Sequence, residues 1–292
     1  MNRMNELVET PFIKNVIDRS VMYTKSGFPV HFTGSTGTGK TTMAIAVAQK
    51  LERPYVILRG NQEMSNIDLI GGATGMMKRT VEDNYIHSVY KTEIKTSPIL
   101  ASGQLVEAVE KGYILIYDEF NRTTPETNNI FLSVLEEKIL PLYGLYGISQ
   151  SEPYIPVHPQ FRALFTSNPS DYAGAHTMQE ALIDRMITIN FESFDFDTYV
   201  QIVARKSNVS IERARILSEV VHSILSRAAD IQYPSLRAGI MIATIMKNGS
   251  IPMDPKNSRF ETLVYEVLSR YVNKEVKPTL KTVMKNEFQR IN

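Results

Sequence analysis

The chain has 292 residues, enough to bury a sizeable core in one large or two modest domains. Its 43% hydrophobic and 22% charged residues are typical of a soluble globular protein, and 32 Lys and Arg against 31 Asp and Glu disfavour a strongly basic nucleic-acid binder. The absence of cysteine excludes disulfides and fits a cytoplasmic chain, and no apolar run approaches the roughly 20 residues that cross a bilayer.

The first predicted elements are a strand and a helix joined by a glycine-rich turn. Val30 and Phe32 are β-forming residues, so a strand is expected over residues 30–33. The turn, GSTGTGKT at residues 34–41, matches the P-loop pattern G-x-x-x-x-G-K-[ST] at every fixed position. A helix is expected after it, because apolar residues recur at helical spacing: Met43, Ala44, Val47 and Leu51.

This turn predicts a phosphate site. Glycines let the backbone N–H groups point inward, and the helix N-terminus adds a positive dipole. Lys40 is expected to reach the β- and γ-phosphates, and the Thr41 hydroxyl to bind Mg²⁺. The alternative is a glycine-rich turn with a chance lysine. The residues expected to hold the nucleotide are Gly34, Ser35, Thr36, Gly37, Thr38, Gly39, Lys40, Thr41 and Thr42.

Further strands and helices alternate along the next part of the chain. Apolar runs at residues 55–58 and 113–117 predict two strands, and continuous apolar runs are typical of a parallel sheet covered on both faces. The stretch 60–102 between them, rich in Gly, Met and charge, is interpreted as an inserted loop with a short helix. A short helix over 104–110 is expected to end at Gly112. Another begins at Thr124, with Pro125 in its first turn.

The remaining pattern predicts an α/β layer followed by helices. Glycines, prolines and tyrosines over residues 140–159 indicate a hairpin and loop, and residues 161–166 and 187–191 supply a fourth and a fifth strand. Strands that alternate with helices indicate right-handed crossovers in one sheet. From about Phe194 the pattern is helical, so we expect an α/β core over 1–193 and a helical domain over 194–292.

An acidic pair ends the third predicted strand. Ligands bind at the carboxyl ends of parallel strands, where Asp118 and Glu119 would lie. Asp118 is expected to complete the Mg²⁺ site, and Glu119 to activate the water that attacks the γ-phosphate. An acidic pair after a buried strand is common by itself, and the P-loop upstream favours the functional interpretation.

Three more polar residues are candidates for the same site. Asn168 follows the fourth strand and is a candidate for orienting the attacking water, although Asn before Pro is also typical of a turn. Arg185 precedes the fifth strand, where it could reach a neighbouring subunit's γ-phosphate. Arg237 opens a helix, from which it could reach the nucleotide of its own subunit. Taken by itself, without the other motifs, each arginine is interpreted as a surface ion-pair partner.

Together these stretches resemble the AAA+ ATPases, and within them the MoxR branch. The likeness rests on GSTGTGKT, YILIYDEFNR, SNIDLIGG, TTPETNNIFLSVLEE, FRALFTSNP, ALIDRM and SLRAG. The run between Gly27 and Met186 is also similar to a gas-vesicle family of these ATPases. The resemblance implies a five-stranded parallel sheet flanked by helices and a small all-α lid domain. It also implies a ring, usually of six subunits, with ATP between them.

In such a ring Arg185 would act in trans and Arg237 in cis, and Arg122 would join the subunit contact. The segment 72–98 falls at the position where MoxR-type proteins carry an additional segment in helix 2. The alternative interpretation is a solvated loop.

The function that the resemblance implies is Mg²⁺-dependent ATP hydrolysis that remodels or assembles proteins during gas-vesicle formation. The implied partners are copies of the chain and other gas-vesicle proteins, without nucleic acid or a membrane span. The implied place is the cytoplasm or the vesicle surface. Three alternatives stay open: a nucleotide-gated scaffold with little turnover, a nucleic-acid motor or loader, which would need a basic face, and a small-molecule kinase.

Overall fold

The computed structural model describes residues 8–35, 37–83, 91–142, 154–168, 176, 179–191, 195–229, 235–254, 256–272 and 275–291, with the backbone alone for 72–83, 91–102 and 288–291. Contacts between Cα atoms divide the chain into two compact units. The first unit comprises Met1–Arg19, Thr33–Ala46 and Asn190–Asn292, and the second comprises Ser20–Phe32 and Val47–Ile189. The predicted boundary at Phe194 falls outside the described residues and stays a prediction.

A five-stranded sheet forms the centre of the second unit, with the strand order β2-β5-β8-β1-β9. β5 pairs in parallel with β2 on one side and with β8 on the other. The predicted parallel sheet is confirmed, and every strand lies within one residue of its expected bounds. The strands are β1 (Val30–Thr33), β2 (Tyr55–Arg59), β5 (Ile114–Asp118), β8 (Arg162–Ser167) and β9 (Ile187–Asn190).

Helices and turns connect these strands. Gly112 ends α4 in the left-handed region at φ +67°, as predicted. Thr124 caps the next helix through its side chain, also as predicted, but that helix is broken into three short pieces. The elements are α1 (Pro11–Lys25), α2 (Lys40–Lys50), α3 (Asn66–Ile70), α4 (Gln104–Lys111), the 3₁₀ turn η2 (Phe120–Arg122), α5 (Pro125–Asn128), α6 (Ile130–Leu132), the π-helical turn η3 (Ser133–Glu137) and α7 (Glu180–Ile183).

An aromatic cluster holds the carboxyl ends of β5 and β8. The rings of Tyr117, Phe120, Phe131 and Phe165 are all fully or almost fully buried. Five of the six ring pairs have centroids between 5.2 and 6.1 Å apart, in tilted and edge-to-face arrangements. Burying one large apolar side chain contributes roughly 1.5–3 kcal/mol, so this cluster fixes the backbone that leads into the acidic pair.

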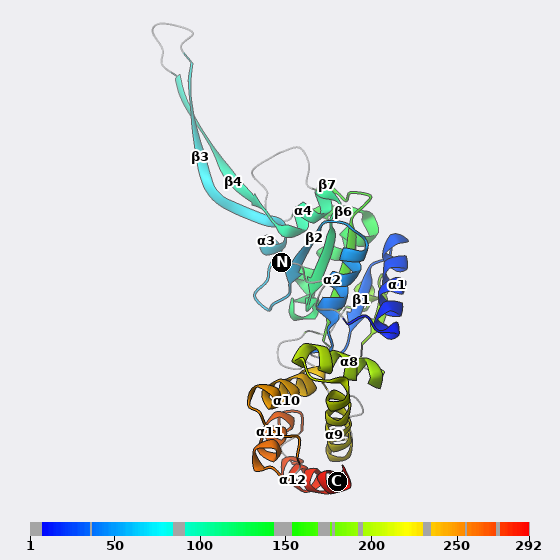
Figure 1. The fold of residues 1–292 in the computed structure, drawn as a ribbon. Coiled ribbons are helices and arrows are strands. Elements are labelled where there is room, and N and C mark those ends of the chain that lie inside the picture. Colours follow the sequence, from blue (N-terminus) through cyan, green and yellow to red (C-terminus); the bar gives the residue numbers. More distant parts are fainter. Residues whose placement is uncertain are drawn as a thin grey trace. The chain divides into compact units, whose positions relative to one another are not determined.

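The inserted segment differs from the prediction. Instead of a loop, residues 71–83 and 91–102 form a long antiparallel hairpin of β3 (Gly71–Asp83) and β4 (Lys91–Ser102), seen as a ribbon in Figure 1. Its base is fixed between α3 and α4, where the Gly103 amide donates to the Ile70 carbonyl at 2.8 Å. The sequence did not reveal this pairing, because the two strands pair residues that are between 8 and 31 positions apart along the chain.

A second hairpin was predicted correctly. β6 (Ile139–Pro141) pairs antiparallel with β7 (Tyr154–Pro156). The loop expected between them lies outside the described residues.

The C-terminal region is helical, as predicted. Side chains cap three of its helices: Asp195 accepts a bond from the Thr198 amide at 2.8 Å, and Ser235 and Asn257 cap the later ones. No helix in the described ranges is long and apolar enough to span a membrane. The helices are α8 (Phe196–Ser207), α9 (Ile211–Ala229), α10 (Leu236–Asn248), α11 (Ser258–Leu268) and α12 (Lys277–Ile291).

Candidate active site

The P-loop lies in the first unit, between β1 and α2, and its backbone requires glycine. Gly37 has φ +84°, a conformation that side chains with a Cβ rarely adopt. Gly34 has φ +147°, and a Cβ there would lie 2.5 Å from the Phe191 carbonyl oxygen. A loop of this form brings main-chain N–H groups close to an anion, which fits the phosphates of a nucleotide.

Lys40 is folded into the loop that precedes it. Its side chain is 8% exposed, and Nζ donates to the carbonyl oxygens of Gly34 at 2.6 Å and Ser35 at 2.7 Å. The Thr38 hydroxyl donates to the same Ser35 carbonyl at 2.9 Å. The ammonium group is therefore held at the loop, at the position predicted for a phosphate-binding lysine. Thr36 lies outside the described residues.

Arg237 approaches the P-loop from the start of α10, within the same unit. A Cβ built on Gly37 would lie 3.5 Å from Cβ and 3.7 Å from Nε of Arg237. The structure thus brings together two of the sequence-predicted features, the loop and the arginine expected to act in cis.

An apolar cavity of about 190 Å³ borders the loop in the first unit. Its position beside the P-loop glycines and its apolar walls fit the flat base of a nucleotide. Thr42, predicted to hold the nucleotide, lines this cavity. The lining residues are Val8, Ile13, Gly37, Thr38, Gly39, Thr42, Met43, Ile202, Lys206, Leu236 and Ile240.

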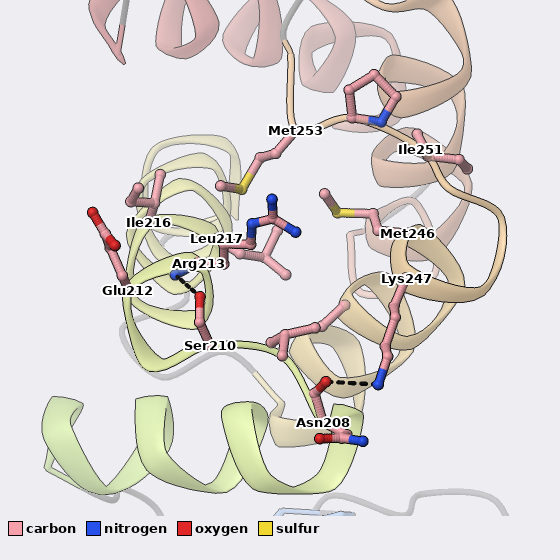
Figure 2. A pocket seen from close by; sticks show the side chains of 13 residues that line it. Asn208, Ser210, Glu212, Arg213, Ile216, Leu217, Met246, Lys247, Ile251 and Met253 are labelled. Carbon is pink, nitrogen blue, oxygen red and sulfur yellow. Dashed lines mark hydrogen bonds between the residues drawn. The ribbon is translucent and has the colours of Figure 1, made fainter.

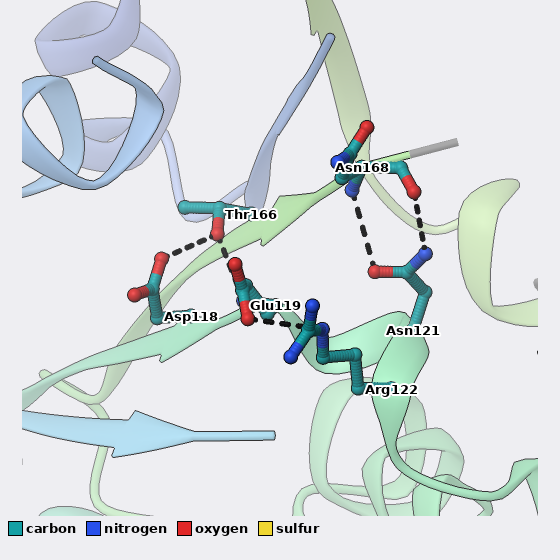
Figure 3. Close-up of polar contacts among 6 residues, drawn as sticks. All are labelled: Asp118, Glu119, Asn121, Arg122, Thr166 and Asn168. Atoms are coloured by element: carbon teal, nitrogen blue, oxygen red, sulfur yellow. Dashed lines mark hydrogen bonds and ion pairs between the residues drawn. The ribbon is translucent and has the colours of Figure 1, made fainter. Parts of the chain in front are cut away.

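In the second unit, one hydroxyl group holds both halves of the acidic pair (Figure 3). The Thr166 hydroxyl donates to Oδ1 of Asp118 at 2.6 Å and accepts the Glu119 amide at 2.9 Å. Thr166 is 1% exposed. The parallel register that pairs Tyr117 with Phe165 carries Thr166 alongside Asp118. Sequence reasoning missed Thr166, and its only signal is its place two residues before Asn168.

Glu119 has an unusual backbone and a charged partner. Its φ is +53°, in the left-handed region that non-glycine residues adopt mainly where the surroundings impose it. A Cβ on Gly60 would lie 2.3 Å from the Glu119 carbonyl oxygen, so the chain is closely packed here. Nε of Arg122 lies 3.1 Å from Oε2 of Glu119 (Figure 3). Arg122, expected at a subunit contact, thus pairs with the predicted catalytic carboxylate of its own chain.

Asn168 is fixed by a second asparagine that the sequence did not single out. Nδ2 of Asn121 donates to the Asn168 carbonyl at 3.1 Å, and Oδ1 of Asn121 accepts the Asn168 amide at 3.4 Å. Both residues are buried. Nδ2 of Asn128 donates to the carbonyls of Phe120 at 3.0 Å and Thr123 at 3.3 Å, which ties the turn after Glu119 to α5. These bonds join the ends of β5 and β8 into one polar network.

Arg185 lies elsewhere in the second unit, in the turn between α7 and β9. Its guanidinium pairs with Glu136 of η3, with Nε at 2.8 Å from Oε2, and also donates to the Ala181 carbonyl. The side chain is 32% exposed. In this chain the arginine is bound to Glu136 and not to the acidic pair.

The predicted Mg²⁺ ligands are Thr41 and Asp118. Hydroxyl and carboxylate oxygens are the donors that Mg²⁺ prefers, so the donor chemistry fits this ion. Across the parts of the chain that the structure describes, there is no cluster of three or more His, Asp or Glu side chains that could by itself hold a metal ion.

Known proteins are similar to this chain over most of its length. The family described as AAA domain (dynein-related subfamily) matches residues 29–186. Gas vesicle ATPase GvpN of Ancylobacter aquaticus is 36% identical over 261 residues, which cover 89% of this chain and 72% of the relative. Gas vesicle ATPase GvpN1 of Halobacterium salinarum is 40% identical over 196 residues, 67% of this chain and 56% of that protein.

Among solved structures, a RuvB mutant of Thermotoga maritima has a TM-score of 0.51 at 12% identity, covering 96% of this chain and 72% of that one. This likeness shows the fold alone. The AAA domain, the P-loop with its parallel sheet and the identity to the curated relatives together show that the chain belongs to the GvpN family of gas vesicle ATPases, which are AAA+ ATPases.

Proposed function

We propose that this ATPase uses Mg²⁺-dependent ATP hydrolysis to remodel or assemble proteins during gas-vesicle formation. The observation that carries the proposal is the anchored acidic pair: Thr166 holds Asp118 and the Glu119 backbone at the end of β5. A protein that only binds nucleotide needs the P-loop but not a positioned base. The names of the relatives support the link to gas vesicles.

In this proposal the first unit binds the nucleotide. Main-chain N–H groups between Gly34 and Gly39, with Lys40, hold the phosphates, and the apolar cavity beside the loop takes the adenine. Lys40 exchanges its bonds to the Gly34 and Ser35 carbonyls for bonds to phosphate oxygens. Arg237 contributes a positive charge from α10, on the same chain.

Three of the proposed hydrolytic residues, Asp118, Glu119 and Asn168, belong to the second unit. Asp118 and the Thr41 hydroxyl would hold Mg²⁺, which when bound neutralises charge on the β- and γ-phosphates. Glu119 accepts a proton from the attacking water, and Asn168 orients that water. Because Arg122 pairs with Glu119, that ion pair must open or shift before the carboxylate can act as a base.

We further propose that copies of the chain form a ring, usually of six subunits in similar ATPases, in the cytoplasm or on gas vesicles. Arg185 then leaves Glu136 and reaches the γ-phosphate of the neighbouring subunit. Other gas-vesicle proteins are the proposed partners, and nucleic acid is not. The balance of 32 basic and 31 acidic residues supports this exclusion.

The test compares vesicle-forming cells that lack this chain with cells that carry only Glu119→Gln, by electron microscopy. We expect absent, few or small vesicles in both, while the shell protein is still made. Normal vesicles in both would reject the role in vesicle formation. Normal vesicles with Glu119→Gln alone would favour the scaffold, in which ATP is bound without a need for hydrolysis.

A further inference from the structure

A second cavity, far larger than the one beside the P-loop, lies wholly within the helical region of the first unit. It has a volume of about 760 Å³, within the range of ligand-binding clefts. Its walls are the first turns of α9, the last turns of α10 and the segment that follows α10. We call it the α9–α10 groove. Its lining residues are Asn208, Val209, Ser210, Glu212, Arg213, Ile216, Leu217, Ala243, Met246, Lys247, Ile251, Pro252 and Met253.

The buried part of the groove lining is apolar and adaptable. Leu217 and Ala243 are each 2% exposed, while Met246 and Met253 are only partly buried. Figure 2 shows Met246 and Met253 pointing into the same space from two different segments. Methionine is unbranched and changes its rotamer readily, and methionine-rich surfaces are typical of sites that receive apolar protein segments.

The charged side chains at the groove differ in whether they already have a partner and in where they point. Nζ of Lys247 donates to the Asn208 carbonyl at 2.8 Å, so this cation is already held. The Arg213 guanidinium points into the groove, whereas the carboxylate of Glu212 points away from it (Figure 2). Within the described residues no hydrogen bond or ion pair to the Arg213 guanidinium is found; only its backbone amide is bonded, to the Ser210 hydroxyl at 3.3 Å. A guanidinium over an apolar surface favours a carboxylate as its partner.

These features favour a protein segment over a small molecule. A small-ligand site usually places several polar groups around its floor to fix the orientation of the ligand. Here the buried lining residues, Leu217 and Ala243, are apolar, the charged ones, Glu212, Arg213 and Lys247, are exposed, and two helices form the walls. That arrangement suits an amphipathic helix, whose apolar side chains recur every three or four residues.

We propose that the α9–α10 groove binds an amphipathic helix of a partner protein, with an apolar row against Leu217, Met246 and Met253 and a carboxylate on Arg213. The choice of the cells in which to seek this partner, those that form gas vesicles, rests on the proposed function. The proposed binding of the helix rests on the groove lining and on the charge of Arg213.

The experiment places the photo-crosslinker p-benzoylphenylalanine at Met253 of the full chain in vesicle-forming cells. Ile67, an apolar side chain that is 61% exposed on α3, serves as the matched control position. Mass spectrometry maps the segment that is captured. The expected result is one segment of another protein, amphipathic as a helix and with an acidic side chain within one turn of the cross-link.

That segment is then synthesised as a peptide, and its Kd is measured for the wild-type chain, Arg213→Gln and Arg213→Glu. We expect at least about tenfold weaker binding to Arg213→Glu and an intermediate loss with Arg213→Gln, and recovery with Arg213→Glu when the acidic side chain of the peptide is changed to Lys. Circular dichroism verifies that each variant is folded, which we expect because Arg213 is exposed.

Four outcomes would overturn the inference: capture no stronger than at Ile67, capture of a second copy of this chain alone, a captured segment that is basic or wholly polar, or an unchanged Kd for Arg213→Glu. ATP hydrolysis by the wild-type chain is measured in parallel. If the wild-type chain does not hydrolyse ATP, the proposed function is contradicted. The binding role of the groove is then still judged by the cross-link and Kd results.

Discussion

Thr166 shows how much a single buried hydroxyl can determine in this protein. Its oxygen donates to Asp118 and accepts the Glu119 amide, so it acts on two residues with different proposed roles. Its own side chain is closed off from solvent. Thr166 is therefore a positioning residue: it acts through the acidic pair.

We expect Thr166→Val to lower the turnover number and raise the Mg²⁺ concentration needed for half-maximal hydrolysis, each by about 10- to 100-fold, the usual cost of losing a partner behind a metal ligand. Thr166→Ser keeps the hydroxyl and should retain most activity. ATP affinity without Mg²⁺ should stay unchanged in both, because the P-loop is intact. Steady-state kinetics over a Mg²⁺ series measures this, and equal loss in the Val and Ser variants would refute the positioning role.

Substitution of Lys40 tests nucleotide binding separately from hydrolysis. Lys40→Ala removes the charge expected on the β- and γ-phosphates, while the glycine backbone of the loop remains. We expect ATP binding to fall below detection by isothermal titration calorimetry. Lys50→Ala, at the other end of the same helix, is the matched control and should bind as the wild type does. Equal affinity for Lys40→Ala and the wild type would reject the assignment of the site.

At the scale of elements, the β3–β4 hairpin stands apart from the central sheet. Its two strands pair with each other and form a separate two-stranded sheet in the described part of the chain. A two-stranded ribbon is marginally stable by itself, so it adds little to the stability of the core. The hairpin is thus suited to a role outside nucleotide binding.

We therefore expect that joining Gly72 to Ala101 through an Asn-Gly turn, in place of residues 73–100, leaves the core folded. These two residues face each other in the ladder, and Asn-Gly is the usual two-residue turn between such a pair. Calorimetry should show a thermal midpoint within about 3 °C of the wild type and unchanged ATP affinity, since a shift of roughly that size corresponds to only about 2 kcal/mol in a chain of this length. A much larger drop would show that the hairpin supports the core.

For the whole molecule, the proposed ring requires that Arg185 of one subunit contributes to the nucleotide site of its neighbour. Arg185 pairs with Glu136 in the single chain, and that pair is partly exposed. An exposed ion pair contributes little, about 0–1 kcal/mol, so a neighbouring γ-phosphate can replace Glu136 as the partner of the arginine.

If Arg185 acts in trans, Arg185→Ala should bind ATP nearly as the wild type does but hydrolyse it three to five orders of magnitude more slowly, roughly the range for arginine fingers. Mixing it with Glu119→Gln should restore part of the activity, because some interfaces then carry both intact residues. Native mass spectrometry establishes that mixed rings form. Mixed rings without recovered hydrolysis would contradict the trans role.

The sequence alone determined the features that depend on neighbours along the chain. The P-loop, the strand before it, the cap at Thr124 and the stop at Gly112 each follow from a few adjacent residues with restricted backbone or hydrogen-bonding choices. The five apolar runs likewise located the strands, because a strand buried on both faces must be apolar throughout.

Only the tertiary structure decided which distant residues meet. The contact of Thr166 with Asp118 depends on the register of β5 against β8, and a shift of one residue would turn Thr166 to the other face of the sheet. The β3–β4 hairpin and the α9–α10 groove likewise arise from segments that are separated in the sequence. Local patterns specify which elements form, but register and packing between elements are set by the free energy of the whole fold, and these select the partners of Asp118 and Glu119.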